Sequence, residues 1–228
     1  FDNDFAALLP GSDATAVNDG GLLVAEPAVG RCRVICFSPR HDLTISTMTI
    51  PAIRGVVDSW VEQSSSLGAM PAIRYVQIFE NRGALMGASN PHPHCQIWAS
   101  AHLPNEPACE QAAQSDYWEG HRSCLLCDYL LQEGMLRERI VVENAKFLAL
   151  VPFWAIWPFE TMVLPLRHLA GFEEFTSEER DALADILHRL TRRYDHLFEV
   201  PFPYSMGFHQ RPSDGQAHPA WHFHAHFL

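Results

Sequence analysis

The chain has 228 residues, of which 47% are hydrophobic, and a formal net charge of −11 at pH 7. This length is enough for a hydrophobic core and one or two globular units. The negative charge argues against nucleic acid or an anionic membrane as the main partner, because both would repel the chain. The longest apolar run, residues 147–159, is too short for a bilayer span and contains two prolines. We therefore expect neither nucleic acid nor a membrane among its partners.

The start of the chain and its six cysteines indicate the compartment. The sequence begins at Phe1 rather than at a methionine, so we expect a fragment that lacks both ends of a longer protein. No basic stretch followed by an apolar segment opens it. Without a secretory signal, the cysteines favour a reduced, cytoplasmic protein over a disulfide framework.

The first half of the chain predicts a strand, a helix and two further strands. Residues 33–37 form a β-rich run that leads through a proline to His41. Apolar residues at helical spacing in residues 53–60 predict an amphipathic helix with one buried face. Strand patterns follow at residues 75–81 and 92–99.

The strand at residues 92–99 carries the most informative side chains. Residues two positions apart in a strand share a face, so His92, His94 and Gln96 point the same way. One imidazole can attack phosphorus while a carbonyl holds its other nitrogen. Gln96 can donate a hydrogen bond but cannot give up a proton, which favours transfer between phosphates over hydrolysis. Pro93 lacks a backbone donor and favours an edge strand.

The second half of the chain repeats the order of the first. Residues 101–138 are expected to link the halves, and the early part of this link is polar and loop-like. Strands at 139–143 and 147–151 come next. Four features then recur about 130 residues after their first appearance. The pairs are His41 with His168, Ile53 with Leu183, Tyr75 with Tyr204, and His92 with His222.

This repeat predicts the fold class. Each copy reads as strand, helix, strand, strand, and Thr176 with Glu179 forms a capping box before the second helix. The simplest architecture is α+β, with one antiparallel sheet and helices packed on one side of it. We place the first copy in residues 1–110 and the second in residues 111–228.

The second copy contains the ligand set of a structural zinc site. Cys124 and Cys127 have the C-x-x-C spacing of a metal knuckle, and His168 and His222 follow them. Two cysteines and two histidines are typical of a closed tetrahedral site. The repeat makes His41 and His92 the first-copy equivalents of the two histidines, with a cysteine pair expected before residue 1. The alternative for Cys124 and Cys127 is a buried pair in a turn.

A further histidine cluster is predicted beside this tetrad. His224 and His226 share a face with His222, and His209 lies on the second copy of the Tyr75 strand. With one carboxylate these histidines would form an iron or zinc site. Spacing alone leaves three candidate carboxylates open, namely Glu106, Glu110 and Glu119.

Several segments resemble one enzyme family. Residues 89–99, Ser-Asn-Pro-His-Pro-His-Cys-Gln-Ile-Trp-Ala, resemble the active-site signature of the galactose-1-phosphate uridylyltransferase family in the histidine-triad superfamily. Segments similar to that family also occur at residues 1–8, 34–39, 79–83, 157–161 and 203–207. The resemblance runs nearly from end to end, and it implies that both repeats are histidine-triad-like.

The resemblance implies a nucleotidyltransferase of galactose metabolism with a ping-pong mechanism. His94 would attack the α-phosphorus of UDP-glucose, release glucose 1-phosphate and hold UMP. Galactose 1-phosphate would then take the UMP and leave as UDP-galactose. The implied substrate-binding residues are Gln96 and Ser89 at the phosphates, Asn81 at the nucleotide, and Asn3 and Asp4 at the ribose.

The resemblance also concerns metals and assembly. It implies a structural zinc at His41 and His92, and it favours Glu110 as the carboxylate of an iron-type site with His209, His224 and His226. It further implies a homodimer. Two alternatives remain open: a related nucleotide-sugar phosphorylase or nucleotidyltransferase that acts on another base or hexose, and a non-catalytic, metal-stabilised nucleotide-binding module.

Overall fold

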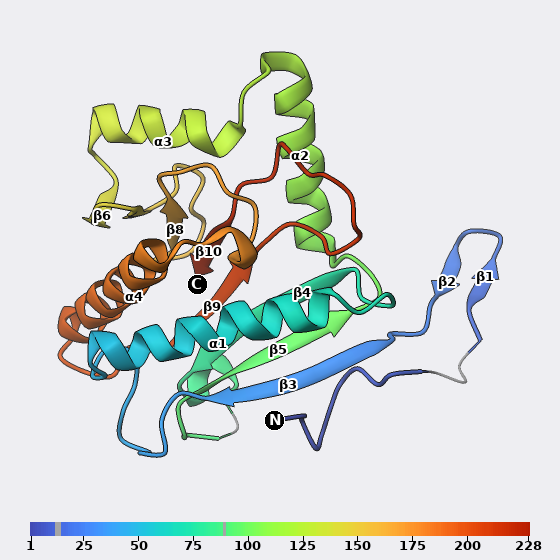
Figure 1. The fold of residues 1–228 in the computed structure, drawn as a ribbon, viewed down its shortest axis with the longest axis horizontal. Helices are drawn as coiled ribbons and strands as arrows, with labels where there is room; N and C mark the ends of the chain where they lie inside the picture. Colours follow the sequence, from blue (N-terminus) through green and yellow to red (C-terminus); the bar gives the residue numbers. More distant parts are fainter. Residues whose placement is uncertain (12–14, 89) are drawn as a thin grey trace.

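An eight-stranded antiparallel sheet forms the centre of the protein (Figure 1). The structure is a computed structural model that describes residues 1–11, 15–88 and 90–228. In the sheet the strands lie in the order β3-β5-β4-β9-β10-β8-β7-β6. Their bounds are β3 Gly30–Cys36, β4 Tyr75–Arg82, β5 His94–Ser100, β6 Ile140–Glu143, β7 Phe147–Leu150, β8 Thr161–Pro165, β9 Tyr204–His209 and β10 His224–Phe227.

The sheet consists of two copies of one unit. The first copy is β3, α1 (Ile50–Gly68), β4 and β5, and the second is β8, α4 (Ser177–Leu197), β9 and β10. In each copy the last strand lies between the other two. The copies meet where β4 pairs with β9, with Ile78 opposite Phe208. This topology confirms the predicted α+β fold with two tandem repeats, while the division at residue 110 stays a prediction.

The helices α1 and α4 cover one face of the sheet. The apolar side chains of Ile53 and Trp60 in α1 and Leu183 in α4 are fully buried in a core shared with the sheet. The predicted capping box is present, because Thr176 and Glu179 each accept a hydrogen bond from the other's backbone N–H. Within the described residues, no helix has the length and apolar character needed to cross a membrane.

Two further helices, α2 (Asn105–His121) and α3 (Leu125–Leu136), belong to the opposite face. In α3, Leu126 packs with Leu148 and Leu164 of the sheet. Ala149, the residue after Leu148 in β7, points to the other face of the sheet and belongs to the core under α1 and α4. The prediction that helices cover one side only is therefore wrong. The loop predicted early in residues 101–138 is also wrong, because α2 is a largely exposed helix with two buried residues and no apolar stripe.

The position of β5 differs from the prediction. It lies between β3 and β4 rather than at an edge. Pro93 precedes the first residue of the strand, and its carbonyl accepts a hydrogen bond from the backbone N–H of Phe37 at 3.1 Å. The missing donor of the proline therefore interrupts no bond of the ladder.

Smaller elements complete the fold. The hairpin of β1 (Val17–Asp19) and β2 (Leu23–Ala25) projects away from the main sheet (Figure 1). Two short 3₁₀ helices span Ala84–Met86 and Phe172–Glu174. Strands β6 and β7 extend the second copy, so the outer edges of the large sheet are β3 and β6.

Candidate active site and metal clusters

The first residue of β5, His94, is held by a backbone carbonyl. Its Nδ1 lies 2.7 Å from the carbonyl oxygen of His92. A carbonyl can only accept, so Nδ1 carries the proton and donates it to this bond. The lone pair of the neutral ring is then on Nε2, which is the nitrogen able to act as a nucleophile.

His94 and Gln96 lie on the same face of β5, as predicted. The alternate residues Cys95 and Ile97 point to the other face of the sheet, where they are fully buried under the helices α1 and α4. On the open face, the amide oxygen of Gln96 accepts a hydrogen bond from Nε1 of Trp98 at 3.3 Å. Among the described residues, the amide nitrogen of Gln96 has no acceptor. It can therefore donate to a ligand beside His94.

A cavity of about 1090 Å³ opens on this same face. Phe79, Asn81 and Trp98 line it from the first copy, and His209 and Trp157 line it from the second. A volume of this order and a mainly apolar lining are typical of sites for nucleotide-sized ligands. Sequence reasoning assigned Asn81 to this region but missed the aromatic side chains. Trp98 lies two positions after Gln96 and therefore shares its strand face, which was the sequence signal for an aromatic side chain at this site.

The remaining substrate-binding candidates are placed differently. Asn3 and Asp4 lie in a segment that runs beside β3, where Asn3 donates its backbone N–H to the carbonyl of Cys32 at 3.0 Å. Neither residue lines the cavity. The side-chain oxygen of Asn3 accepts the backbone N–H of Phe5 instead. Ser89 lies outside the described residues.

The structure brings His41 and His92 together. Their Nδ1 atoms are 2.8 Å apart, and the rings meet edge to face with centroids separated by 4.6 Å. His168 and His222 of the second copy also meet edge to face, at 5.4 Å. Each copy therefore places the histidine after its first strand against the histidine before its last strand, as the repeat predicts.

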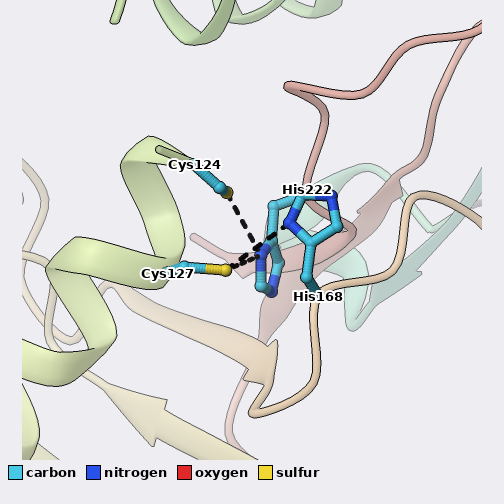
Figure 2. A group of neighbouring side chains, drawn as sticks. All are labelled: Cys124, Cys127, His168 and His222. Atoms are coloured by element: carbon cyan, nitrogen blue, oxygen red, sulfur yellow. Dashed lines mark hydrogen bonds between the residues drawn. The ribbon is translucent and has the colours of Figure 1, made fainter. Parts of the chain in front are cut away.

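Cys124 and Cys127 complete a tetrad with His168 and His222 (Figure 2). The four candidate ligand atoms lie within 4.8 Å of one another. The hydrogen bond with Cys127 and the two nearby imidazoles lower the pKa of the Cys124 thiol, against the opposing effect of burial. The bond with Cys124 in turn raises the pKa of His168. Two soft sulfur and two imidazole ligands suit zinc.

The second cluster joins Glu110 of α2 to three histidines. Glu110 Oε1 lies 2.8 Å from His209 Nδ1, 3.4 Å from His224 Nε2 and 3.5 Å from His226 Nε2. Among the three carboxylates that spacing left open, Glu110 is the one in this group.

Electrostatics support a cation at the Glu110 cluster. Burial alone would raise the pKa of Glu110, but the three neighbouring imidazoles, His209 first among them, hold it well below its ordinary range. Burial lowers the pKa of His226 to about 4. Its buried Nε2 has no hydrogen-bond partner among the described residues. An oxygen and three nitrogen donors that converge in this way fit iron or zinc.

Comparisons with known proteins agree with this geometry. The profile described as galactose-1-phosphate uridyl transferase, N-terminal domain, matches residues 1–104, and the corresponding C-terminal profile matches residues 110–228. Galactose-1-phosphate uridylyltransferase of Haemophilus influenzae is 50% identical over the whole chain, and that of Rattus norvegicus is 46% identical over the whole chain. The chain spans 64% and 60% of the length of these two relatives.

Solved structures give the same result. A structure titled "Structure of uridylyltransferase" has a TM-score of 0.91 and 27% identity, covering 100% of this chain and 71% of its own. A galt-like protein from Arabidopsis thaliana, at 23% identity and a TM-score of 0.86, shares the fold and likewise covers 100% of this chain and 71% of its own. Both halves of the sequence match their respective profiles, and the chain therefore belongs to the galactose-1-phosphate uridyl transferase family.

Proposed function

We propose that this protein transfers UMP from UDP-glucose to galactose 1-phosphate through a covalent intermediate on His94. The observation that carries the proposal is the 2.7 Å contact between His94 Nδ1 and the carbonyl of His92. This contact fixes the tautomer in which Nε2 is unprotonated, so the nucleophile is ready without a separate base. Membership of the family supports the choice of substrates.

The reaction consists of two displacements at the same phosphorus. In the first, Nε2 of His94 forms a bond to the α-phosphorus of UDP-glucose, and the bond to the bridging oxygen breaks to release glucose 1-phosphate. In the second, a phosphate oxygen of galactose 1-phosphate attacks the uridylylated histidine. The N–P bond breaks, His94 is regenerated and UDP-galactose leaves. The developing positive charge on the ring is stabilised by the carbonyl of His92, which accepts from Nδ1.

Gln96 makes the intermediate suited to transfer. Its amide nitrogen can donate to a phosphoryl oxygen, but the amide cannot protonate a leaving group. A sugar phosphate is a good leaving group and needs no such acid, whereas expulsion of an alkoxide benefits from one. The cavity lined by Phe79, Asn81 and Trp98 is the proposed place for the uridine.

Metals and assembly are part of the same proposal. His41 and His92 would provide the histidine half of a structural zinc site, which anchors the carbonyl that holds His94. Iron or a second zinc would bind to Glu110, His209, His224 and His226. This ion would link α2 to the sheet. We further propose a cytoplasmic homodimer.

The experiment is detection of the intermediate. Full-length protein incubated with UDP-glucose, without acceptor, should gain the mass of UMP on the peptide that contains His94. His94→Ala should abolish the adduct, while His121→Ala, which removes an exposed histidine at the end of α2, should retain it. Galactose 1-phosphate added to the adduct should release UDP-galactose. If no adduct forms, or if it persists in His94→Ala, the transfer mechanism is wrong and the binding-module alternative gains support.

A further inference from the structure

Three separate segments converge at the Cys124 tetrad. Cys124 is the N-cap residue of α3 and Cys127 lies in its first turn. His168 follows β8, and His222 precedes β10. Cys124 and His222 are buried, whereas His168 is exposed and Cys127 is intermediate. Side chains from a helix start and two strand ends therefore meet at one partly covered point (Figure 2).

The distances between these side chains match a tetrahedral metal site. Nδ1 of His222 lies 3.5 Å from Sγ of Cys124 and 3.3 Å from Sγ of Cys127. Nδ1 of His168 lies 3.5 Å from Sγ of Cys127. Zn–S bonds of about 2.3 Å and Zn–N bonds of about 2.0–2.1 Å at tetrahedral angles place sulfur and nitrogen about 3.6 Å apart.

Hydrogen bonding alone does not explain these contacts. Nε2 of His222 lies 3.0 Å from the carbonyl oxygen of Pro165 and donates to it, so Nδ1 is the unprotonated nitrogen. That nitrogen has a single lone pair, yet both thiols approach it. A cation between the three atoms accounts for both approaches. The bond to Pro165 also fixes the ring, as outer hydrogen bonds commonly do for histidine ligands.

The backbone of His222 connects the tetrad to the Glu110 cluster. The carbonyl of His222 accepts from Nδ1 of His224 at 2.8 Å, which leaves Nε2 of His224 to face Glu110. The N–H of His222 donates to the side chain of Gln114 at 2.8 Å. Gln114 and Glu110 lie one turn apart on α2. His222 of the tetrad is thus connected to the Glu110 cluster in two ways, through Gln114 of α2 and through His224 at the start of β10.

We propose that Cys124, Cys127, His168 and His222 bind a structural zinc ion, and that this ion, by fixing His222, positions His224 for the Glu110 cluster. Four protein ligands close the coordination sphere, so the ion has a structural role. The inference does not depend on the proposed reaction, since it concerns ligands and packing in the second copy only.

Alkylation of the wild-type full-length protein tests the site without a mutation. Zinc-loaded protein should resist alkylation at Cys127, removal of zinc by a chelator should expose that thiol, and added Zn²⁺ should restore protection. Cys36, which is exposed, should react equally in all three states. Protection of Cys127 that does not respond to zinc would overturn the proposal.

Metal content tests stoichiometry and the link to His224. The double variant Cys124→Ser, Cys127→Ser should contain one zinc fewer per chain, whereas Cys36→Ser should keep the wild-type content. Metal remaining in the Glu110 cluster of the double variant should be removed at about tenfold lower chelator concentration, because a group that orients a ligand has been released. An unchanged zinc count refutes the site, and removal at the wild-type concentration refutes the link.

Discussion

The two His-x-His segments have the same local geometry and different surroundings. In the first copy the carbonyl of His92 accepts from Nδ1 of His94 at 2.7 Å, and in the second the carbonyl of His222 accepts from Nδ1 of His224 at 2.8 Å. His94 is half-buried on an open face of the sheet, whereas His224 is buried against Glu110. The same device therefore presents Nε2 to the open face of the sheet in one copy and to Glu110 in the other.

The residue two positions further on separates the two roles. Gln96 follows His94 in the first copy, and His226 follows His224 in the second. A neutral amide can bind phosphoryl oxygens, while an imidazole can bind a metal or transfer a proton. The repeated backbone therefore supplies an oriented imidazole in both copies, and the neighbouring side chains determine what that imidazole can bind.

Gln96→His would break this distinction and should have the largest effect. An imidazole beside the uridylylated His94 can deliver a proton and activate water, and general acid–base groups contribute about 10²–10⁴-fold to such steps. We expect transfer to galactose 1-phosphate to fall by about 10²-fold and the adduct to hydrolyse faster. The half-life of the UMP adduct in the absence of acceptor measures the second effect. A half-life equal to that of wild type would show that Gln96 does not protect the intermediate.

The two copies also differ in the buried polar residues on the helix-covered face of the sheet. Glu80 is a buried carboxyl that accepts from the hydroxyl of Tyr204 at 3.0 Å. Burial raises the pKa of Glu80 to about 7, although Tyr204 and Arg82 oppose the shift. Gln210 lies 130 residues after Glu80 and is also buried. Its amide oxygen accepts from the hydroxyl of Ser64, and its amide nitrogen donates to the carbonyl of Val76. The second copy thus uses a neutral group where the first uses a titratable one.

Glu80→Gln should remove a pH dependence of stability. Because the folded pKa is raised from 4.5 to about 7, the folded state binds the proton more tightly, and stability falls as pH rises through that window. The wild type should lose up to about 3 kcal/mol of unfolding free energy between pH 4.5 and 7 from this group. Urea denaturation at pH 5 and pH 8 measures it. Glu80→Gln should reduce the difference in unfolding free energy between pH 5 and pH 8, and Gln210→Glu should increase it. The same difference in all three proteins would show that Glu80 is not the source of the pH dependence.

The smallest effect concerns the two helix starts. Thr176 exchanges two hydrogen bonds with Glu179 at the start of α4, whereas Thr49 accepts one long bond, 3.4 Å, from Ala52 at the start of α1. Loss of an N-cap side chain typically costs about 0.5–2 kcal/mol. We expect Thr176→Ala to lower the unfolding free energy by about 1 kcal/mol and Thr49→Ala by about half as much. Thermal denaturation compares them, and the opposite order would show that the capping box adds nothing.

Much of the fold followed from periodicity in the sequence. The spacing of Ile53 and Trp60 indicated α1, the Thr176–Glu179 pair indicated the start of α4, and the recurrence of His92 as His222 indicated the repeat. These patterns are local or strictly periodic, so no knowledge of tertiary structure is needed to find them.

Other features depend on tertiary contacts that leave no local pattern. The helix α2 buries little apolar surface, so its sequence lacks the stripe that marks a helix. Glu110 differs from Glu106 and Glu119 only in facing three histidines that follow about a hundred residues later, and without the family resemblance spacing could not select it. The central position of β5 arises from strand order, which Pro93 alone does not determine.

The pairing of β4 with β9 has a consequence for how the molecule comes apart. Its hydrogen bonds join residues more than a hundred positions apart, and they continue the ladder from one copy into the other without a gap. Neither copy can open at this seam without exposing two inner strand edges to water. The repeats should accordingly melt as one cooperative unit, in which amide protons on both sides of the seam exchange with solvent at the same rate-limiting opening.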